Sequence, residues 1–204
     1  MRKILLAGLV SFSLSASLAE ARFFIGLETG YEFNGKPTFV NSTKEMVFGS
    51  SVLTSGIGRD AWTIGYSLGT EHIWGFVGLR WFLGVNYSLG VLDKSQGLQV
   101  LETQLGIDTI FNFTDSDSFA MGMFVGIAGN INIMTLTGKL LQFDYMGSGA
   151  IGRLGFTFKF GSHNRLDITS SIPILQVAPF IDDNLKRGGI YDPIRLTIGY
   201  KVVI

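Results

Sequence analysis

The sequence predicts an all-β protein: a transmembrane antiparallel up-and-down β-barrel of about eight strands, with ten as the other possible number. Three observations predict it. Apolar residues recur at every second position along most of the chain, which is the period of a strand with two different faces. Most of these segments exceed the roughly 9–11 residues that a tilted strand needs to cross a bilayer. Tight polar turns alternate with longer connections, as in outer-membrane barrels.

The first residues have the pattern of a secretory signal peptide. Arg2 and Lys3 form a short positive region, and an uncharged, largely apolar stretch follows over residues 4–19. Ala19-Glu20-Ala21 then provides the small-x-small pattern of a cleavage site. We expect a signal peptide over residues 1–21 and a single outer-membrane barrel domain over residues 22–204. A buried N-terminal helix is the alternative for this segment.

Composition excludes several classes of function. The chain has no Cys, which excludes disulfides, thiolate metal sites and lipid attachment through a cysteine. Its 16 acidic and 16 basic residues balance, so no basic face for a nucleic acid is expected. The 27 Gly and 4 Pro residues fit a sheet in which strands pack closely, and they do not fit a disordered chain.

The strands follow from the two-residue period, which is clearest after the cleavage site. Phe23, Ile25 and Leu27 alternate there with Gly26 and Glu28, so one face is apolar and the other small or acidic. The same reasoning along the chain places strands at 22–33, 60–69, 73–92, 98–113, 119–134, 145–160, 165–176 and 190–204. Within 145–160, the sequence Gly147-Ser148-Gly149 interrupts the alternation and indicates a bulge.

The connections and the aromatic residues predict which end of the barrel faces the periplasm and which faces outward. Residues 69–72, 114–118 and 161–164 are predicted as tight periplasmic turns, and 34–59 and 178–189 as longer outer connections. Aromatic side chains on the apolar face are expected to form girdles at the two membrane interfaces. We place Phe23, Phe111, Phe113, Phe119, Phe158, Phe160 and Tyr200 at the periplasmic rim, and Tyr31, Phe33, Trp62, Trp81 and Tyr87 at the outer one.

Two other architectures compete with the barrel. Residues 118–138 carry no charge and contain Gly122-x-x-x-Gly126, which resembles a membrane helix with a dimer face. Asn130, Asn132 and the two-residue period favour a strand there instead. A soluble periplasmic β-sandwich has alternating strands too, and it remains the second alternative.

The two ends of the predicted domain carry a family resemblance. Arg22-Phe23-Phe24-Ile25-Gly26-Leu27-Glu28-Thr29-Gly30-Tyr31, directly after the signal peptide, resembles small Gram-negative outer-membrane proteins, and most of all the Helicobacter-type outer-membrane protein family. The closing strand is similar to the assembly signal of such families, with apolar residues at Tyr200, Val202 and Ile204, although most members end in Phe. The resemblance implies an outer-membrane location, contact with lipid, lipopolysaccharide and the barrel-assembly machinery, and roles in adhesion, envelope integrity or solute passage.

The inward face is predicted to hold charges of both signs. An eight-stranded barrel has an interior just wide enough for side chains, so a wide pore is not expected. Enclosed charges are costly unless they are paired, which favours a plug of mutual ion pairs over a gated proton or ion path. The inward charged residues are Glu28, Glu32, Arg80, Glu102, Asp108, Arg153, Lys159, Arg165, Asp167, Arg195 and Lys201.

The sequence contains few residues in patterns that indicate catalysis or metal binding. Its two histidines, His72 and His163, fall in predicted periplasmic turns, away from the outer leaflet where lipid-modifying barrels act. We therefore expect no enzyme, no catalytic residue, no metal site and no cofactor. Residues 147–152 match a dinucleotide fingerprint by letters, but they lack its strand–turn–helix context and are interpreted as a glycine-rich strand.

The long outer connection supplies candidate binding residues. Phe39, Met46 and Phe48 lie among polar residues there, and exposed apolar side chains on a surface loop can mark a binding site for a host or surface ligand. They can equally fold back over the barrel mouth. The first functional hypothesis is a structural or surface-interaction role, similar to adhesion. The alternative is a narrow channel, or a lateral conduit near strand 145–160, for small or hydrophobic solutes.

Overall fold

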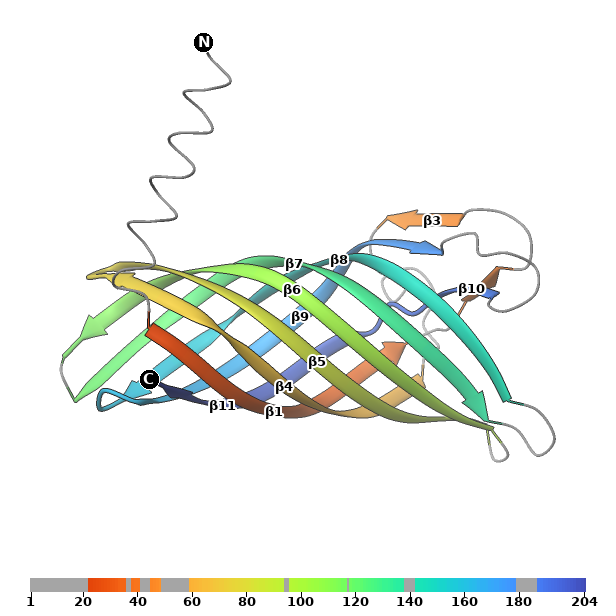
Figure 1. Ribbon diagram of the computed structural model, residues 1–204, viewed down its shortest axis with the longest axis horizontal. Helices are drawn as coiled ribbons and strands as arrows, with labels where there is room; N and C mark the ends of the chain where they lie inside the picture. The colour runs from red at the N-terminus through yellow and green to blue at the C-terminus, as the bar shows by residue number, and fades with distance from the viewer. Residues whose placement is uncertain are drawn as a thin grey trace, which may run out of the picture.

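The computed structural model describes residues 22–35, 38–40, 45–48, 59–93, 96–116, 118–137, 142–178 and 187–204. The expected signal peptide over residues 1–21 lies outside them. Eight long strands form a closed antiparallel barrel (Figure 1), which confirms the predicted fold class and fixes the number of barrel strands at eight. These strands are β1 (Arg22–Gly35), β4 (Arg59–Trp74), β5 (Val77–Asp93), β6 (Gln96–Asp115), β7 (Phe119–Thr137), β8 (Gln142–Phe160), β9 (Asn164–Ala178) and β11 (Ile194–Val203).

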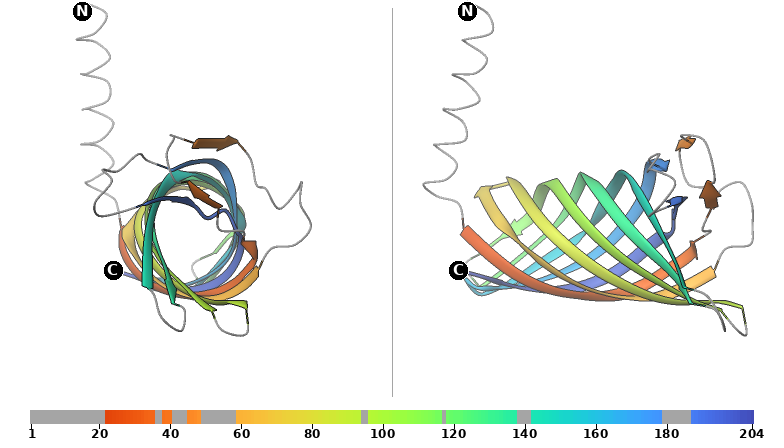
Figure 2. Two further views of the ribbon diagram at one scale, coloured as in Figure 1. Left: turned by 90° about the vertical axis from the view of Figure 1, so that its right-hand side faces the viewer. Right: turned by 45° about the vertical axis from the view of Figure 1, so that its right-hand side comes forward.

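Closure joins the first strand to the last. β1 pairs with β11 in antiparallel register from Phe24 opposite Val203 to Phe33 opposite Ile194. The view along the axis shows the resulting ring of strands (Figure 2). In lipid, an open sheet edge would leave backbone groups without hydrogen-bond partners, so this pairing is what permits the sheet to span a membrane.

The two ends of the barrel differ. At one, called the turn end below, short connections join β4 to β5, β6 to β7 and β8 to β9. At the other, the loop end, three short strands lie near the barrel mouth: β2 (Thr38–Val40), β3 (Glu45–Phe48) and β10 (Arg187–Ile190). The loop end therefore carries the additional short strands, as the predicted alternation of turns and longer connections implies.

The outer surface is apolar and the interior is largely polar. Along β4 the exposed side chains Trp62 and Ile64 alternate with buried Thr63 and Ser67. This inverts the pattern of a soluble sheet, where apolar residues fill the core, and it matches a barrel surrounded by lipid. Among the residues that the structure describes, no helix is long and apolar enough to cross a membrane.

The first turn lies further along the chain than predicted. β4 continues to Trp74, so Glu71 and His72 belong to the strand and both are buried, contrary to the turn predicted over 69–72. The hairpin loop is residues 75–76, with Gly75 at a φ of 59°, as the first central position of a two-residue hairpin requires. This shift also places Trp81, opposite Thr70, in the half of the barrel near the turn end, not at the outer rim.

A bulge does lie near the predicted irregularity, but its extra residue belongs to the neighbouring strand. Ala150 pairs with Leu175 and Ile151 with Pro173, so Ile174 of β9 has no opposite residue on β8. Pro173 has no N–H to donate to a ladder, which accounts for the break in register at this point. Beyond the bulge, the buried positions of β9 change from odd to even numbers.

The last predicted strand, 190–204, is two strands. β10 pairs in parallel with β8 and antiparallel with β2, whereas β11 begins only at Ile194. Tyr191 and Asp192 lie between them and are buried. Because Pro193 cannot donate a ladder hydrogen bond, the chain leaves one pairing before it enters the next.

We expect Gly155→Ala to destabilise the barrel by about 1–3 kcal/mol, the usual cost of overpacking. A Cβ at Gly155 would collide with the carbonyl oxygen of Ile168 and lie 2.7 Å from Phe124 Cζ. The urea midpoint of unfolding in detergent micelles, followed by unboiled gel mobility, measures the effect. Gly97→Ala is the control, since a Cβ at Gly97 would meet nothing within 4 Å. Equal midpoints for the two variants would contradict this packing.

Candidate functional site

The candidate site is the barrel lumen, where charged side chains from most of the long strands meet. Each comes from an inward position of its strand, as the two-residue period requires. Within the described residues, seven ion pairs join five carboxylates to five cations, so the connected set has no net charge. The carboxylates are Glu32, Glu71, Glu102, Asp108 and Asp167, and the cations are Arg80, Arg153, Arg165, Arg195 and Lys201.

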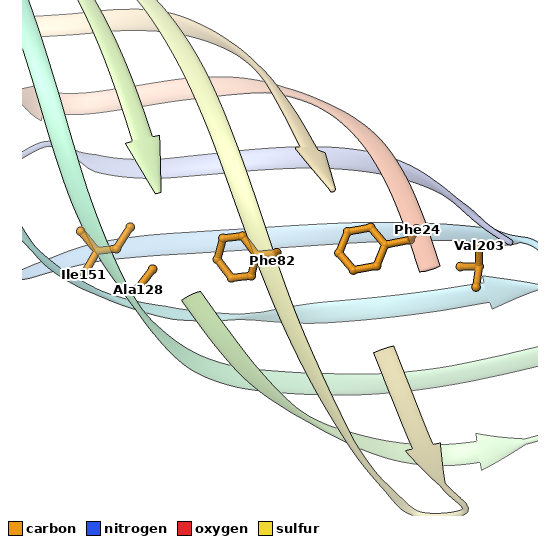
Figure 3. Packing of buried hydrophobic residues seen from close by; sticks show 5 residues of the cluster. All are labelled: Phe24, Phe82, Ala128, Ile151 and Val203. Atoms are coloured by element: carbon orange, nitrogen blue, oxygen red, sulfur yellow. The ribbon is translucent and has the colours of Figure 1, made fainter. Parts of the chain in front are cut away.

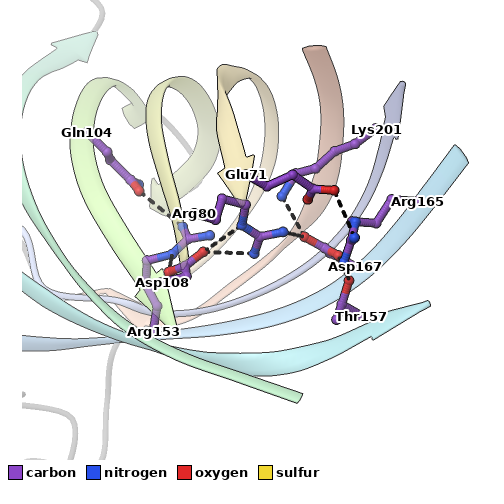
Figure 4. Close-up of polar contacts among 9 residues, drawn as sticks. All are labelled: Glu71, Arg80, Gln104, Asp108, Arg153, Thr157, Arg165, Asp167 and Lys201. Carbon is purple, nitrogen blue, oxygen red and sulfur yellow. Dashed lines mark hydrogen bonds and ion pairs between the residues drawn. The ribbon is translucent and has the colours of Figure 1, made fainter. Parts of the chain in front are cut away.

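Arg80 of β5 is the centre of this network (Figure 4). Its Nη2 lies 2.8 Å from Asp108 Oδ2 and its Nη1 lies 2.6 Å from Asp167 Oδ2, and its side chain is 0% exposed. Asp167 also accepts hydrogen bonds from Lys201 Nζ at 2.5 Å and from Thr157 Oγ1 at 2.6 Å. Asp108 is shared with Arg153, whose Nε lies 3.2 Å from its Oδ1. Every charge at the centre therefore faces an opposite one.

Aromatic rings pack against these cations from inside the lumen. The guanidinium carbon of Arg80 lies 4.7 Å from the Phe124 ring centroid, and that of Arg153 lies 4.1 Å from the Phe82 centroid. Lys201 Nζ lies 5.1 Å from the Phe24 centroid. Figure 3 shows Phe24 and Phe82 in a buried apolar cluster with Ala128, Ile151 and Val203. Cation–π attraction and close packing thus replace the water that a wider lumen would hold.

Toward the loop end, the network continues through Arg195 of β11. Its Nη1 lies 2.6 Å from Glu102 Oε1, and its Nε donates to Glu32 Oε1 at 2.8 Å. Gln104 joins the two halves, because its Nε2 donates to Glu102 and its Oε1 accepts from Arg153 at 3.5 Å. The hydrogen-bonded chain therefore extends along the lumen without a break.

Tyr191 covers the loop-end side of this network. Its hydroxyl donates to Glu32 Oε2 at 2.8 Å. Burial, with the Glu32 carboxylate nearby, raises the pKa of Tyr191 well above its ordinary value, so the phenol remains a donor. The ring belongs to a second buried cluster with Leu98, Val100, Met134 and Tyr145. Apolar packing therefore closes the mouth above the charges.

The structure brings the eleven charged residues predicted to point inward into the lumen, where Arg165 and Asp167 form ion pairs and Lys159 lines the same turn-end space as Arg165. Glu32, Arg80, Glu102, Asp108, Arg153, Arg195 and Lys201 take part in the ion pairs above. Glu28 accepts from the Asn86 amide at 2.8 Å when that amide is oriented to satisfy its neighbours. Of the predicted assembly residues, Tyr200 and Val202 lie exposed on the outer face of β11, and Ile204, which follows the end of that strand, is exposed as well.

The predicted outer-loop residues lie in the short strands of the loop end. Phe39 of β2 is opposite Gly189 of β10, and Met46 and Phe48 of β3 are opposite Val177 and Leu175 of β9. Their backbones are therefore tied to the barrel through main-chain pairing. The rest of the long connection lies outside the described residues.

Three residues of the network are not among those predicted from the sequence. Glu71 is predicted in a turn, although it continues the inward phase of Thr63 and Ser67, from which its inward direction follows. Gln104 lies at an inward position between Glu102 and Asp108, but it is uncharged and so is not among the predicted inward charges. Tyr191 gives no signal in the sequence, since its role depends on the chain folding back over the mouth.

The two histidines of the sequence both lie at the turn end of the barrel. His163 is an exposed turn residue, and the His72 ring packs 4.0 Å from the Trp74 ring near the turn end. The described residues contain no group of three or more His, Cys, Asp and Glu side chains with the spacing of a metal site.

No family model and no curated protein matches this sequence. Among solved structures, the chain is similar to a major outer membrane protein from Thermus thermophilus, with a TM-score of 0.51 and 9% identity over 90% of this chain and 99% of that one. This likeness supports an outer-membrane barrel fold.

The chain is also similar to Ail, the attachment invasion locus protein of Yersinia pestis, with a TM-score of 0.43 and 7% identity over 89% of this chain and 98% of that one. Neisserial surface protein A gives a TM-score of 0.45 and 10% identity over 89% of this chain and 96% of that one. The expected Helicobacter-type family is not confirmed by these comparisons. At such identities the fold alone is shared, and a shared fold does not establish a shared activity.

We expect Arg80→Met to destabilise the barrel by about 3–5 kcal/mol, because it leaves two buried carboxylates short of a partner. Chemical unfolding in detergent micelles measures the loss. The double variant Arg80→Met/Asp108→Asn is expected to lose less than the sum of its single variants, since the second change removes a carboxylate that the first left underpaired. Additive losses would show that the two side chains are not coupled.

Proposed function

We propose that this protein is a closed, non-conducting and non-enzymatic outer-membrane barrel that presents its loop end to molecules at the cell surface. In this orientation the turn end faces the periplasm and the apolar outer surface contacts outer-membrane lipid and lipopolysaccharide. The observation that carries the proposal is the continuous bonded network along the lumen. It fills the space that a solute would need.

The energetics of the lumen support a plug rather than a path. A permeating ion would have to separate pairs such as Arg80 and Asp108, both 0% exposed. Breaking a buried pair costs several kcal/mol, because each charge is left without compensation in a medium of low polarity. The pairs therefore stabilise a closed state.

A lateral conduit near the glycine-rich strand has no support in the described residues. β8 pairs with β7 from Phe160 opposite Phe119 to Gln142 opposite Thr137. On its other edge it pairs with β9 from Phe160 opposite Asn164 to Ser148 opposite Val177. One of these two ladders would have to separate along its length before a solute could leave sideways through it.

The loop end supplies the surface for binding. Backbone pairing holds β2 against β10 and β3 against β9, so the sequence between β1 and β4 is anchored at two points. An anchored loop loses less conformational entropy on binding than a free one. Phe39, Met46 and Phe48 remain the proposed contact residues for a surface ligand.

In planar bilayers, we expect the wild-type protein to give no sustained conductance. The variant Arg80→Ala/Arg153→Ala/Tyr191→Ala, shown by unboiled gel mobility to be folded, should give discrete conductance steps because it empties the centre of the lumen and removes the ring that covers its mouth. Tyr87→Ala, on the exposed outer face, is the matched control and should remain silent. A wild-type channel whose selectivity changes on charge removal would overturn the plug.

Surface binding is tested with cells that display the protein, using immobilised lipopolysaccharide and epithelial monolayers as probes. We expect Phe39→Ser/Met46→Ser/Phe48→Ser to reduce adherence to the level of cells that lack the protein. Phe76→Ser, an exposed substitution in the turn at the opposite end, should leave adherence unchanged. If the folded triple variant adheres as the wild type does, these residues are not the contact site.

A further inference from the structure

A cavity of about 360 Å³ opens at the turn end of the lumen, beyond the last ion pair of the network. Its charged lining consists of Arg22, Lys159, Arg165 and Glu71, contributed by β1, β8, β9 and β4. Its volume is within the range of about 300–1,000 Å³ that is usual for small-ligand sites. The plug leaves this space open, so the proposed surface role of the loop end makes no use of it.

The cavity has an excess of positive charge. Arg165 Nη2 lies 2.9 Å from Glu71 Oε1, which is the one ion pair in the described lining. No ion pair joins Arg22 or Lys159 to a carboxylate within the described residues. Among the described lining residues, three cations therefore share a single carboxylate, in contrast to the balanced network deeper in the lumen.

The strand register places three cations of neighbouring strands in one row. Lys159 of β8 is directly opposite Arg165 of β9, which is in turn directly opposite Lys201 of β11. Like charges on directly opposite residues destabilise a sheet unless something compensates them. Asp167 compensates Lys201, at 2.5 Å, and Glu71 compensates Arg165. For Lys159, at the end of this row, compensation has to come from outside the described residues.

A buried donor is also available. Arg165 is 3% exposed, and its two terminal nitrogens bind Thr157 and Glu71, as Figure 4 shows. Its Nε has no hydrogen-bond partner among the described residues. A buried guanidinium N–H without an acceptor is costly, so an oxygen atom that reached this N–H from the cavity would stabilise it.

We propose that the turn-end cavity binds a phosphomonoester group through Arg22, Lys159 and Arg165. The three cationic side chains and the one carboxylate of the described lining leave two positive side-chain charges, and a phosphomonoester carries about −1.5 to −2 at pH 7. A single carboxylate ligand would leave one of these charges uncompensated. Arginine presents planar donors that match phosphate oxygens, and lysine adds a point charge. The group belongs either to a soluble periplasmic molecule or to a lipid headgroup at the rim.

The test measures binding of inorganic phosphate to the full barrel in neutral detergent micelles by calorimetry, with sodium chloride at matched ionic strength as the reference. We expect phosphate to bind and to raise the urea midpoint, and Lys159→Gln and Arg22→Gln each to weaken binding by about tenfold, as loss of one charged contact implies. Neither residue belongs to the ion-pair network. Arg59→Gln, at the loop-end start of β4, is the control and should bind phosphate as the wild type does.

A second experiment distinguishes a lipid headgroup from a soluble molecule as the source of the phosphate group. The same titration is made in nanodiscs of phosphatidylcholine alone and of phosphatidylcholine with phosphatidic acid. If phosphatidic acid suppresses the phosphate titration in the wild type, the group comes from a lipid headgroup. If the titration is the same in both discs, the group comes from a soluble molecule. The proposal is overturned if phosphate has no effect beyond that of chloride, or if Lys159→Gln and Arg22→Gln bind it as tightly as Arg59→Gln.

Discussion

The interior of an eight-stranded barrel is narrow, and this constraint governs the whole molecule. Every second residue of eight strands points into a space that side chains nearly fill. Charged residues placed there lose water, so each must face an opposite charge or the barrel loses several kcal/mol. Arg80, between Asp108 and Asp167, is the clearest result of that constraint. The glycines opposite the large rings follow from it as well, because Phe124, packed on Arg80, occupies the volume that a side chain at Gly155 would need.

The two ends of the lumen are closed in different ways, and this separates their proposed roles. At the loop end, Tyr191 and an apolar cluster cover the charges, and short strands tie the outer connections to the barrel. At the turn end, the network stops at Glu71 and Arg165 and leaves a positively charged cavity. In the proposed orientation, the loop end is the surface for partners outside the cell, and the turn-end cavity is a small site that opens on the periplasmic side.

The positions of the strands were predictable because alternation is a local property that repeats over many residues. Where a local pattern fits both a turn and a strand, the sequence alone does not decide between them. The polar run from Gly69 to His72 looks like a turn, yet the strand continues to Trp74 because Gly75 supplies the positive φ of the hairpin. Likewise, the interruption at 147–149 is not itself the bulge. The extra residue is Ile174 on the adjacent strand, next to Pro173, and only the register between the two strands shows which one carries it.

The sequence by itself determined the barrel, its approximate number of strands and the inward direction of Glu32, Arg80, Glu102 and Asp108, because side-chain direction in a strand follows from position alone. Only the tertiary structure decided which carboxylate meets which cation, since Arg80 and Asp167 are 87 residues apart and meet across the lumen. It also decided that Tyr191 covers the mouth and that Lys159, Arg165 and Lys201 form one row. Such contacts depend on strand register and barrel closure, which are set by the packing of all eight strands together.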